Sequence, residues 1–372
     1  MPTSSDHAIA SGFAGRPRAV QWLALVLLSM LLAGGLLLLQ LPAALLLGPL
    51  VAGIIISVAG AKLQVPAAVG ALSQALLGCM IAHMLPGWSA TTALAAHWLL
   101  FVLGVLAVIG ISAALGWALS RLDILPGTTA LWGLSPGAAT AMTLMAEAYG
   151  ADVQMVAFMQ YVRVLLVALI ASLIAHSLGL NASHGLAGGD WWAPVSWLAL
   201  AQTLAVAVVG IVLAHGLRWR VGALLLPLIL GAALSQTGWV HLAMPPWLIA
   251  LLYAAIGWRI GLRFTLPLLR HVARALPRVL ASSLALIAAC GGLGMLLVWF
   301  DGVDPLTAYL ATSPGGADTA AIIAASTSID VQFVMTMQMA RLLAVLLLGP
   351  PLVRLLAAQI ERRRHARAGA GA

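Results

Sequence analysis

The sequence predicts an all-α integral membrane protein made of two inverted repeats of about five transmembrane helices. Three observations lead to this prediction: an apolar composition, an internal duplication, and a one-sided distribution of positive charge along the chain. Each repeat is expected to contain a Ser-Pro-Gly segment, either re-entrant or a broken helix, directly before its last span.

The composition indicates that the chain folds in a lipid bilayer. Apolar residues make up 63% of the 372 residues and charged residues 8%, against about 45–50% and about 25% in soluble domains. The net charge of +8 is expected to mark cytoplasmic loops rather than a nucleic-acid surface. Cys79 and Cys290 lie in separate apolar runs without a metal or redox spacing. Both cysteines are therefore expected to be small core residues.

The duplication is a match of the chain to itself at one constant offset, the offset that carries Ser135 onto Ser313, which we call the repeat shift. The identical pairs include Ser135/Ser313, Pro136/Pro314, Gly137/Gly315, Asp152/Asp330, Gln154/Gln332, Met159/Met337, Gln160/Gln338 and Arg163/Arg341. Shared hydrophobicity does not produce a constant register over such a length, whereas an internal repeat does.

The spans are predicted from runs of about 20 apolar residues, the length that crosses a hydrocarbon core. In the first repeat, residues 19–178, they are expected at 19–40, 43–60, 66–85, 92–120 and 153–178. In the second repeat, residues 194–355, they are expected at 194–217, 222–238, 246–262, 279–300 and 331–354. The remaining segments are a polar N-terminal tail (1–18), a polar linker (179–193) and a basic C-terminal tail (356–372).

Positive charge favours one of two topologies. If the Ser-Pro-Gly segments cross the membrane, each repeat has six crossings, the repeats run parallel, and the arginines fall on both sides. If the segments enter and return, each repeat has five crossings and the repeats are inverted. All lysines and arginines between the spans then lie on one side, together with both termini. The positive-inside rule therefore predicts the inverted arrangement with cytoplasmic termini.

The Ser-Pro-Gly segments, expected at 126–150 and 305–328, are suited to membrane depth only if protein or water lines them, because Gly and Pro break a helix there. Ser135 and Ser313 are expected to be N-caps, with the following prolines at the first helical position. The N-terminus of a short helix would then face the bilayer interior and could bind an anion. Two such segments at matching positions indicate the site of a transporter.

The last span of each repeat is expected to place an arginine near the bilayer midplane. Arg163 follows Asp152 by eleven residues, about 16 Å along a helix, and Arg341 follows Asp330 in the same way. An arginine at this depth costs at least ~2.5 kcal/mol and needs a partner. Two interpretations stay open: the arginines bind solute or ion, or they hydrogen-bond the broken backbone and hold it in place.

Two acids break the symmetry of the repeats and are candidate partners of the arginines. Glu147 aligns with Ala325, and Asp318 aligns with Thr140. Such an acid could carry a single coupling cation or proton, or it could only neutralise an arginine. The candidate substrate- or ion-binding residues are Ser135, Pro136, Gly137, Thr140, Glu147, Asp152, Gln160, Arg163, Ser313, Pro314, Gly315, Gly316, Asp318, Thr319, Asp330, Gln338 and Arg341.

The duplicated region, with Ser-Pro-Gly and the Asp-x-Gln…Gln-x-x-Arg span in each half, resembles the AbrB family of Gram-negative membrane proteins. The resemblance covers about residues 20–355. It implies a multi-pass protein of the bacterial inner membrane, and family members are described either as regulators of gene expression or as ammonia monooxygenases. The layout is also similar to that of glutamate and citrate sodium symporters, at the level of the fold.

No enzyme, metal or cofactor is expected, because the nine histidines are scattered singly and do not form a copper or iron site. No motif that reads nucleic acid is found either. The sequence favours an ion-coupled secondary transporter of a small anionic solute, using Na⁺ or H⁺, with the lipid bilayer as its surroundings and a homodimer as one option for its assembly. The alternative is a membrane sensor that affects gene expression indirectly, without transport.

Overall fold

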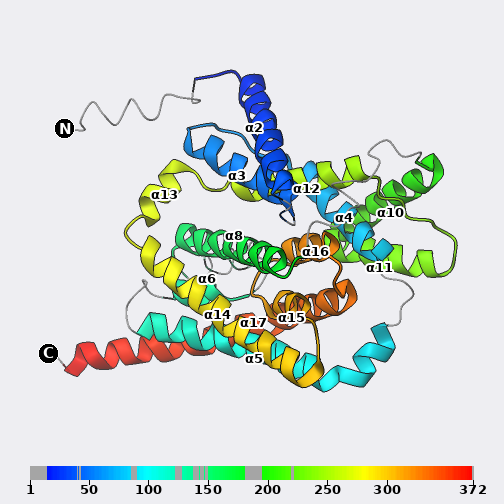
Figure 1. The fold of residues 1–372 in the computed structure, drawn as a ribbon. Helices are drawn as coiled ribbons and strands as arrows, with labels where there is room; N and C mark the ends of the chain where they lie inside the picture. Colours follow the sequence, from blue (N-terminus) through cyan, green and yellow to red (C-terminus); the bar gives the residue numbers. More distant parts are fainter. Residues whose placement is uncertain are drawn as a thin grey trace. The chain divides into compact units, whose positions relative to one another are not determined.

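The computed structural model of the protein is all-helical in the residues that it describes (Figure 1). These residues are 15–39, 41, 43–84, 90–121, 128–136, 142, 146, 150–180, 195–218 and 222–370; within them, the side chains of 84–97, 100, 318, 346, 347, 350, 354 and 357–370 lie outside the description. No strand occurs in this part of the chain.

Ten helices occupy the ten ranges predicted as spans. Those of the first repeat are α2 (Arg18–Leu38), α3 (Ala44–Val58), α4 (Ala67–Met84), α5 (Ala90–Arg121) and α8 (Val153–Ser177). Those of the second repeat are α10 (Trp197–Gly216), α11 (Gly222–Gln236), α12 (Pro246–Gly261), α14 (Leu276–Asp301) and α17 (Val331–Ala370). Shorter helices are α6 (Thr129–Leu134), α13 (Leu266–Val272), α15 (Pro305–Thr312) and α16 (Ala317–Ala325).

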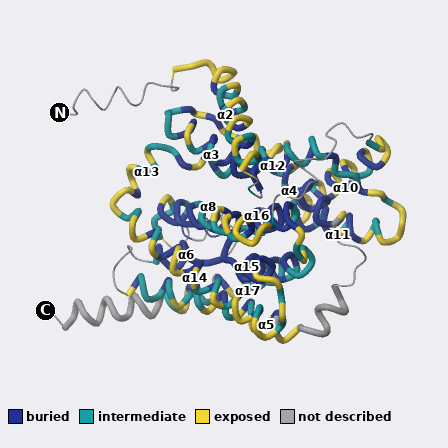
Figure 2. Tube along the Cα trace, viewed as in Figure 1, coloured by how far each residue is buried: buried dark blue, intermediate teal, exposed yellow. Residues whose placement is uncertain are grey.

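Several of these helices have the length and composition of membrane spans. Five qualify alone: Arg18–Leu38, Phe101–Arg121, Val153–Ser177, Trp197–Gly216 and Leu276–Asp301. A sixth candidate is the pair α12 and α13, bent by 50° at the break between them. Many outward side chains are large and apolar, for example Met30 on α2 and Phe300 on α14, and these faces are exposed in Figure 2. Lipid tails would cover them, as in a multi-pass membrane protein.

The helix ends repeat at the same offset as the sequence duplication. The first and last residues of α11 (Gly222–Gln236) are the counterparts, at the repeat shift, of the first and last residues of α3 (Ala44–Val58). The last spans, α8 and α17, begin at Val153 and Val331, which are counterparts as well. The two copies therefore share helix boundaries as well as residue identities, because the same local sequence starts and stops each helix.

Two regions depart from the predicted elements. The counterpart of the continuous helix α5 is divided into α13 and α14, where Pro277 in the first turn of α14 prevents one continuous helix. α17 does not end near residue 354 but continues through the basic tail to Ala370. The tail sequence Ala-Ala-Gln-Ile-Glu-Arg-Arg-Arg consists mainly of strong helix formers, which explains the extension.

The chain folds into two compact units, and each unit takes helices from both repeats. Unit 1 consists of Met1–Thr91, Ser172–Leu269 and Ala321–Gln332, and so contains the first three spans of each repeat. Unit 2 consists of Thr92–Ala171, Arg270–Ala320 and Phe333–Ala372. It contains most of the last two predicted spans of each repeat, the first Ser-Pro-Gly segment, and the second segment as far as Ala320.

Unit 1 is built from close packing between the repeats. α3 packs against α2 and α12, and α11 packs against α10 and α4, so the third span of each repeat lies on the second span of the other. Glycines allow this approach: a Cβ at Gly257 would lie 2.7 Å from the carbonyl oxygen of Leu46. Gly257 and Gly261 have the Gly-x-x-x-Gly spacing that brings membrane helices together.

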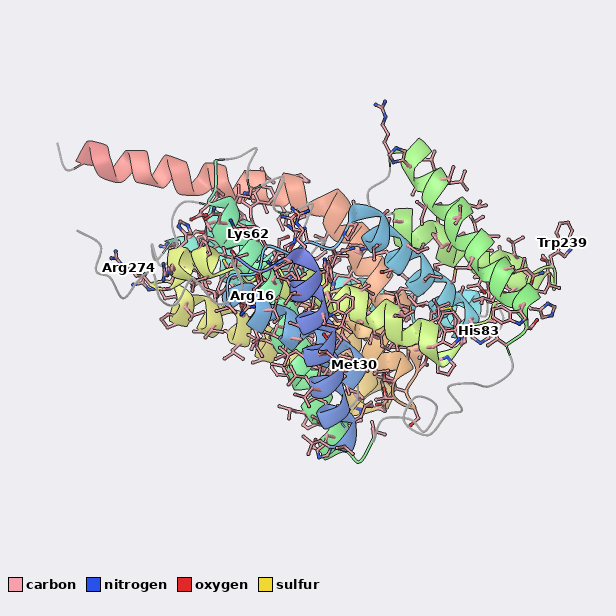
Figure 3. All side chains as sticks on the ribbon, turned by 90° about the horizontal axis from the view of Figure 1, so that it is seen from above. Arg16, Met30, Lys62, His83, Trp239 and Arg274 are labelled. Carbon is pink, nitrogen blue, oxygen red and sulfur yellow. The ribbon has the colours of Figure 1, made fainter. Side chains whose placement is uncertain are left out.

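Residues predicted on opposite sides of the membrane are separated within unit 1. Figure 3 shows Arg16 and Lys62 near each other at one end, and His83 and Trp239 toward the other. Gln21 connects the first pair, since its side chain donates to the carbonyl oxygen of Arg16 at 2.9 Å and accepts from the N–H of Lys62 at 3.1 Å. This separation agrees with the one-sided charge of the predicted topology, while the inversion of the repeats stays a prediction.

Unit 2 encloses α6 and α15, the short helices before the two Ser-Pro dipeptides. All six residues of α6 are buried, and so are Leu306–Thr312 of α15 (Figure 2). α14 packs against both short helices. The interior of the protein thus surrounds the backbone that proline and glycine interrupt, as broken helices in a membrane require.

Candidate functional site

The broken segment of the first repeat is held by side chains of α8. After α6, Ser135 leaves the helical conformation with a ψ of 123°. Gln160 Nε2 donates to the carbonyl oxygens of Trp132 and Ser135 at 3.0 and 3.1 Å. Arg163 Nη1 donates to the carbonyl oxygens of Leu134 and Ser135 at 3.3 and 3.0 Å, and Arg163 Nη2 donates to Gln160 Oε1 at 2.6 Å.

The broken segment of the second repeat is held by the equivalent residues of α17. Gln338 Nε2 donates to the carbonyl oxygen of Leu310 at 2.6 Å and to that of Ser313 at 3.5 Å. Arg341 donates to the carbonyl oxygens of Ser313 and Gly315, the latter at 2.9 Å, and to Gln338 Oε1. Except for Gly315, which takes the place of Leu134, each residue is related to its counterpart by the repeat shift. We call these two sets the first and second Gln–Arg clusters.

Both arginines are buried positive charges. Arg163 is 1% exposed and Arg341 4% exposed. In the described residues neither guanidinium is paired with a carboxylate, and the Nε atom of each has no hydrogen-bond partner. The two guanidiniums lie near each other, because Arg341 donates to the carbonyl oxygen of Gly315, and a Cβ on Gly315 would lie 2.8 Å from Cγ1 of Val167, one turn after Arg163 on α8. Unit 2 therefore contains two neighbouring guanidiniums whose terminal nitrogens are committed to the protein backbone and to glutamine.

The predicted capping role of the two serines is wrong. Ser135 and Ser313 terminate α6 and α15 instead of starting the helices that follow, and α16 begins only at Ala317. The proline after each serine ends the preceding helix, because proline disfavours the α conformation in the residue before it. The serine is then extended, and the apolar helix before it ends there.

The N-cap of the second segment is Asp304, which the sequence analysis did not identify. Its Oδ1 accepts hydrogen bonds from the N–H groups of Leu306 and Thr307, both at 3.0 Å, and Pro305 is the first residue of the helix. An acid followed by proline is a clear helix start. Asp304-Pro305 and Ser313-Pro314 both fit a helix start when only the local sequence is considered. The sequence analysis assigned the helix start to Ser313-Pro314 and so missed Asp304.

The other predicted site residues divide between described and undescribed parts. Thr319 is buried, and its hydroxyl donates to the carbonyl oxygen of Gly316 at 2.9 Å, at the start of α16. Pro314 lies buried in the break. The predicted residues Gly137, Thr140 and Glu147 lie outside the described residues, as does the side chain of Asp318. The proposed pairing of the arginines with Glu147 and Asp318 therefore stays a prediction.

Asp152 caps the last span of the first repeat and lies away from the Gln–Arg cluster. Its Oδ1 accepts from the N–H of Met155 at 3.0 Å, and its Oδ2 lies 2.9 Å from His271 Nε2. Burial raises the pKa of Asp152, but the hydrogen bonds from Met155 and His271 outweigh it and leave the pKa below its ordinary value of 3.8. Sequence reasoning missed His271 because it is 119 residues away. Asp330, the counterpart, is exposed before α17.

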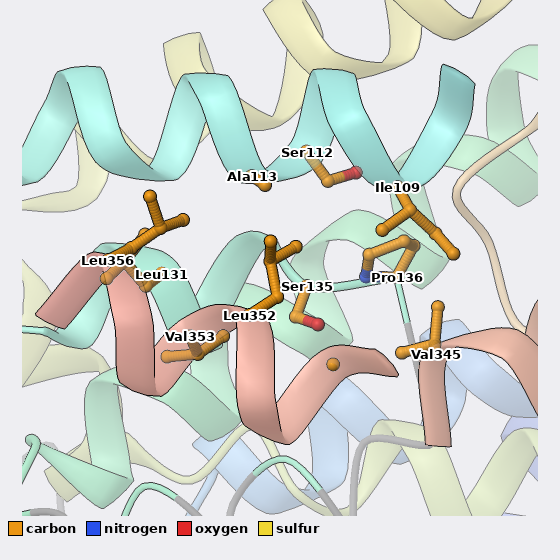
Figure 4. Close-up of a pocket in the computed structure, with 11 residues that line it drawn as sticks. Ile109, Ser112, Ala113, Leu131, Ser135, Pro136, Val345, Leu352, Val353 and Leu356 are labelled. Carbon is orange, nitrogen blue, oxygen red and sulfur yellow. The ribbon is translucent and has the colours of Figure 1, made fainter. Parts of the chain in front are cut away.

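Each break packs against the last span of the other repeat. A Cβ on Gly315 would lie 2.8 Å from Cγ1 of Val167 on α8. Ser135 and Pro136 line a cavity together with Val345 of α17 (Figure 4), and Val345 is the counterpart of Val167. Each last span thus hydrogen-bonds the break of its own repeat and contacts the break of the other.

This cavity is too small for a metabolite. Its volume is about 20 Å³, which is space for one water molecule. Figure 4 shows mainly apolar side chains around it, with the hydroxyls of Ser112 and Ser135 as exceptions. The Ser112 hydroxyl donates to the carbonyl oxygen of Val108 in its own helix at 2.8 Å. A metal centre is not found either in the described residues, where no three His, Cys, Asp or Glu side chains gather.

Comparisons of the sequence with known proteins identify a family. The sequence model described as "Transition state regulatory protein AbrB" matches residues 45–357. A candidate regulator named AbrB in Escherichia coli (strain K12) is 46% identical over 345 residues, covering 92% of this chain and 99% of that protein. The protein YhjN of Bacillus subtilis (strain 168) is 29% identical over 305 residues, covering 77% and 78%. No solved structure matches the chain.

Proposed function

Starting from the fact that the chain belongs to the AbrB family, we propose that it is an ion-coupled secondary transporter of a small anionic solute in the bacterial inner membrane. The observation that supports this proposal most strongly is the pair of Gln–Arg clusters in unit 2, each of which holds the broken segment of one repeat. Transporter sites are commonly formed where discontinuous helices of two repeats meet.

The charge of the clusters supports an anion as the solute. Two guanidiniums buried in unit 2 create a positive potential that water does not screen. The N-terminus of α16, which follows the second break directly, adds the partial positive charge of its free N–H groups. An anionic solute would lower the electrostatic energy of this interior, whereas a cation would raise it.

The proposal includes the inverted five-plus-five arrangement with both termini in the cytoplasm. The one-sided distribution of lysine and arginine supports it, and so does the separation of Arg16 and Lys62 from His83 and Trp239 in unit 1. Either Na⁺ or H⁺ would drive transport, with Asp318 and Glu147 as candidate carriers.

A second candidate function is a sensor that affects gene expression without transport. The name of the Escherichia coli relative favours it, because that protein is named as a candidate regulator. Binding of a small anion alone would satisfy a sensor. Flux across a membrane is required only of a transporter and therefore separates the two functions.

The test begins with purified protein in detergent. Melting temperatures are measured with a panel of carboxylates, amino acids and amines, with and without Na⁺, and the best ligands are then tested for flux in proteoliposomes under Na⁺ or proton gradients. We expect a small anion to raise the melting temperature and to be accumulated only with a gradient. The variant Met30→Ala, on the lipid-facing side of α2, should transport normally. Binding without flux would favour the sensor, and stabilisation by amines alone would contradict an anionic solute.

A further inference from the structure

We propose that Arg163 and Arg341 together bind one small carboxylate next to Cys290, so that a single anion is shared by the two repeats. This inference rests on the proposed transport of an anion and specifies where that anion binds. It concerns the Nε–H groups of the two arginines, which do not take part in the hydrogen bonds to the broken segments.

The first step is charge compensation. Arg163 and Arg341 are almost fully buried and have no carboxylate partner in the described residues. They lie near each other, because Arg341 donates to the carbonyl oxygen of Gly315 at 2.9 Å, and a Cβ on Gly315 would lie 2.8 Å from Val167, one turn after Arg163 on α8. A buried charge without a partner is strongly unfavourable, and a second like charge nearby increases this cost. One anion between the two groups would replace a repulsion by two attractions.

The second step is the number and position of free donors. Each guanidinium has five N–H groups, and the Nη atoms of both arginines already bind carbonyl and amide oxygens. The Nε–H of each arginine has no acceptor among the described residues. Two single donors on two separate side chains match the two oxygens of one carboxylate, with one hydrogen bond to each oxygen.

The third step is the place of Cys290. Its side chain is fully buried, and it lies on α14 one turn before Gly294, where a Cβ would lie 3.0 Å from Oγ1 of Thr312, the residue before Ser313. Its counterpart at the repeat shift is Ser112, which lines the cavity beside the first broken segment. The equivalent faces of α5 and α14 therefore adjoin the broken segments, and Cys290 lies on this face of α14. A bound carboxylate would cover its thiol.

The chain contains the reporter and its control. Cys290 belongs to unit 2 and Cys79 to unit 1, both are free and fully buried, and Cys79 contacts the carbonyl oxygen of Thr203 at 3.8 Å. Purified protein is treated with methyl methanethiosulfonate in a MES buffer, and modification of each cysteine is followed by peptide mass spectrometry. The additions are acetate, succinate, chloride and sulfate, each as its choline salt.

We expect acetate or succinate to protect Cys290 but not Cys79. At a concentration ten times its Kd, a ligand that covers the thiol should slow modification about 11-fold. Equal protection by chloride would overturn the assignment to a carboxylate, and protection of both cysteines or of neither would overturn the site. Protection of Cys290 without flux would keep this site and remove the transport function, whereas carboxylate flux without protection would keep transport and overturn this site.

A second variant supplies the negative charge within the chain. Cys290→Asp places a carboxylate next to both guanidiniums, and Cys290→Asn places a neutral side chain of similar size there. In buffer without small anions, Cys290→Asp should melt at a higher temperature than Cys290→Asn. Added carboxylate should stabilise the Asn variant and leave the Asp variant unchanged. A Cys290→Asp protein that is less stable than Cys290→Asn, or that fails to fold, would overturn the proposal.

Discussion

The first and second Gln–Arg clusters hold their breaks with the same hydrogen bonds, but their surroundings differ. In both, a glutamine and an arginine one turn apart on the last span bind carbonyl oxygens around a Ser-Pro sequence. In the first repeat, Asp152 at the start of α8 is hydrogen-bonded to His271. In the second, its counterpart Asp330 is exposed, and Gly316 takes the place of Ala138. What was kept in both copies is the support of a broken backbone, and what diverged is the chemistry around it.

The shared part has a plain physical reason. Proline ends the short helix and removes a backbone donor, so carbonyl oxygens near the break lose their partners. A buried carbonyl without a donor is unfavourable, and guanidinium groups make strong charge-assisted hydrogen bonds to such oxygens. The glutamine, three residues before each arginine, both donates to the break and orients the guanidinium through its Oε1.

The largest effect is expected from Arg163→Leu and Arg341→Leu. Each change leaves one buried carbonyl oxygen, that of Leu134 or Gly315, without its donor, and takes one of two donors from the serine carbonyl oxygen beside it. This should destabilise the protein by about 2–4 kcal/mol. The loss should be similar in both copies, because the bonds are the same. Denaturant unfolding in detergent measures it, with the exposed Arg121→Leu as control at under about 1 kcal/mol. Losses that differ by more than this between the two variants would show that the clusters are not equivalent.

Gly315→Ala should reveal the contact between the break and the other repeat. Its Cβ would lie 2.8 Å from Cγ1 of Val167, a clash that should cost about 1–3 kcal/mol. Gly316→Ala introduces the residue found in the first copy and meets atoms only at 3.6 Å or more, so it should be nearly neutral. Val167→Ala should rescue Gly315→Ala in a double-mutant cycle of melting temperatures. Simple additivity of the two changes would mean that Val167 does not limit the space at Gly315.

Gly349→Ala replaces a residue of α17 by its counterpart, Ala171. The new methyl group would make an ordinary contact of 3.4 Å with Val345, beside the cavity of the first break, and would raise helix propensity. The protein should gain up to about 1 kcal/mol in unfolding free energy. Gly294→Ala is the matched comparison, because its Cβ would lie 3.1 Å from the carbonyl oxygen of Ala308 and should destabilise. If both changes act alike, the space assigned to the cavity is wrong.

Asp152→Asn should have the smallest effect and a defined pH dependence. The asparagine keeps the cap on α8 but loses the charge paired with His271, which is worth a few tenths of a kcal/mol to about 1 kcal/mol at a partly exposed site. Because the pKa of Asp152 is lowered in the folded protein, its stabilisation is present above about pH 4 and is lost as the pH falls through the folded-state value. Melting curves should therefore separate wild type from variant at neutral pH and converge in acid.

The ion pair itself is tested by His271→Ala. If His271 is the partner of Asp152, the double variant Asp152→Asn/His271→Ala should be about as stable as the less stable of the two single variants. The difference in unfolding free energy should be under about 0.3 kcal/mol. If the losses of the two single variants simply add in the double variant, Asp152 and His271 do not stabilise each other. Asp152 would then act only as the cap of α8.

The sequence predicted the elements well because their signals are local. Apolar runs located ten helices, five of which have the length and composition of membrane spans by themselves, and the repeat shift located Gln160, Arg163, Gln338 and Arg341 on equivalent faces. One of the two interpretations left open for the arginines, hydrogen bonding to the broken backbone, is what the structure shows. The role of the arginines in binding stays a proposal.

The parts that were missed depend on distant segments or on local ambiguity. Ser-Pro fits both a helix start and a helix end, and only the buried helices before Ser135 and Ser313 decide between them. The pairing of Asp152 with His271 joins residues far apart in the chain, and so does the packing of α14 beside the second break. The division into two units that mix the repeats also leaves no trace in local periodicity.

The constant repeat shift has a consequence for how the protein can evolve. From Ala44 to Arg163 in one copy, and from Gly222 to Arg341 in the other, the two segments have kept equal length although most of their residues have diverged. Surface loops ordinarily accept insertions at little cost, and an unmatched insertion in either copy would have ended the register. Loop length in this protein has therefore been inherited as strictly as any side chain, and a one-residue deletion belongs among its severe mutations.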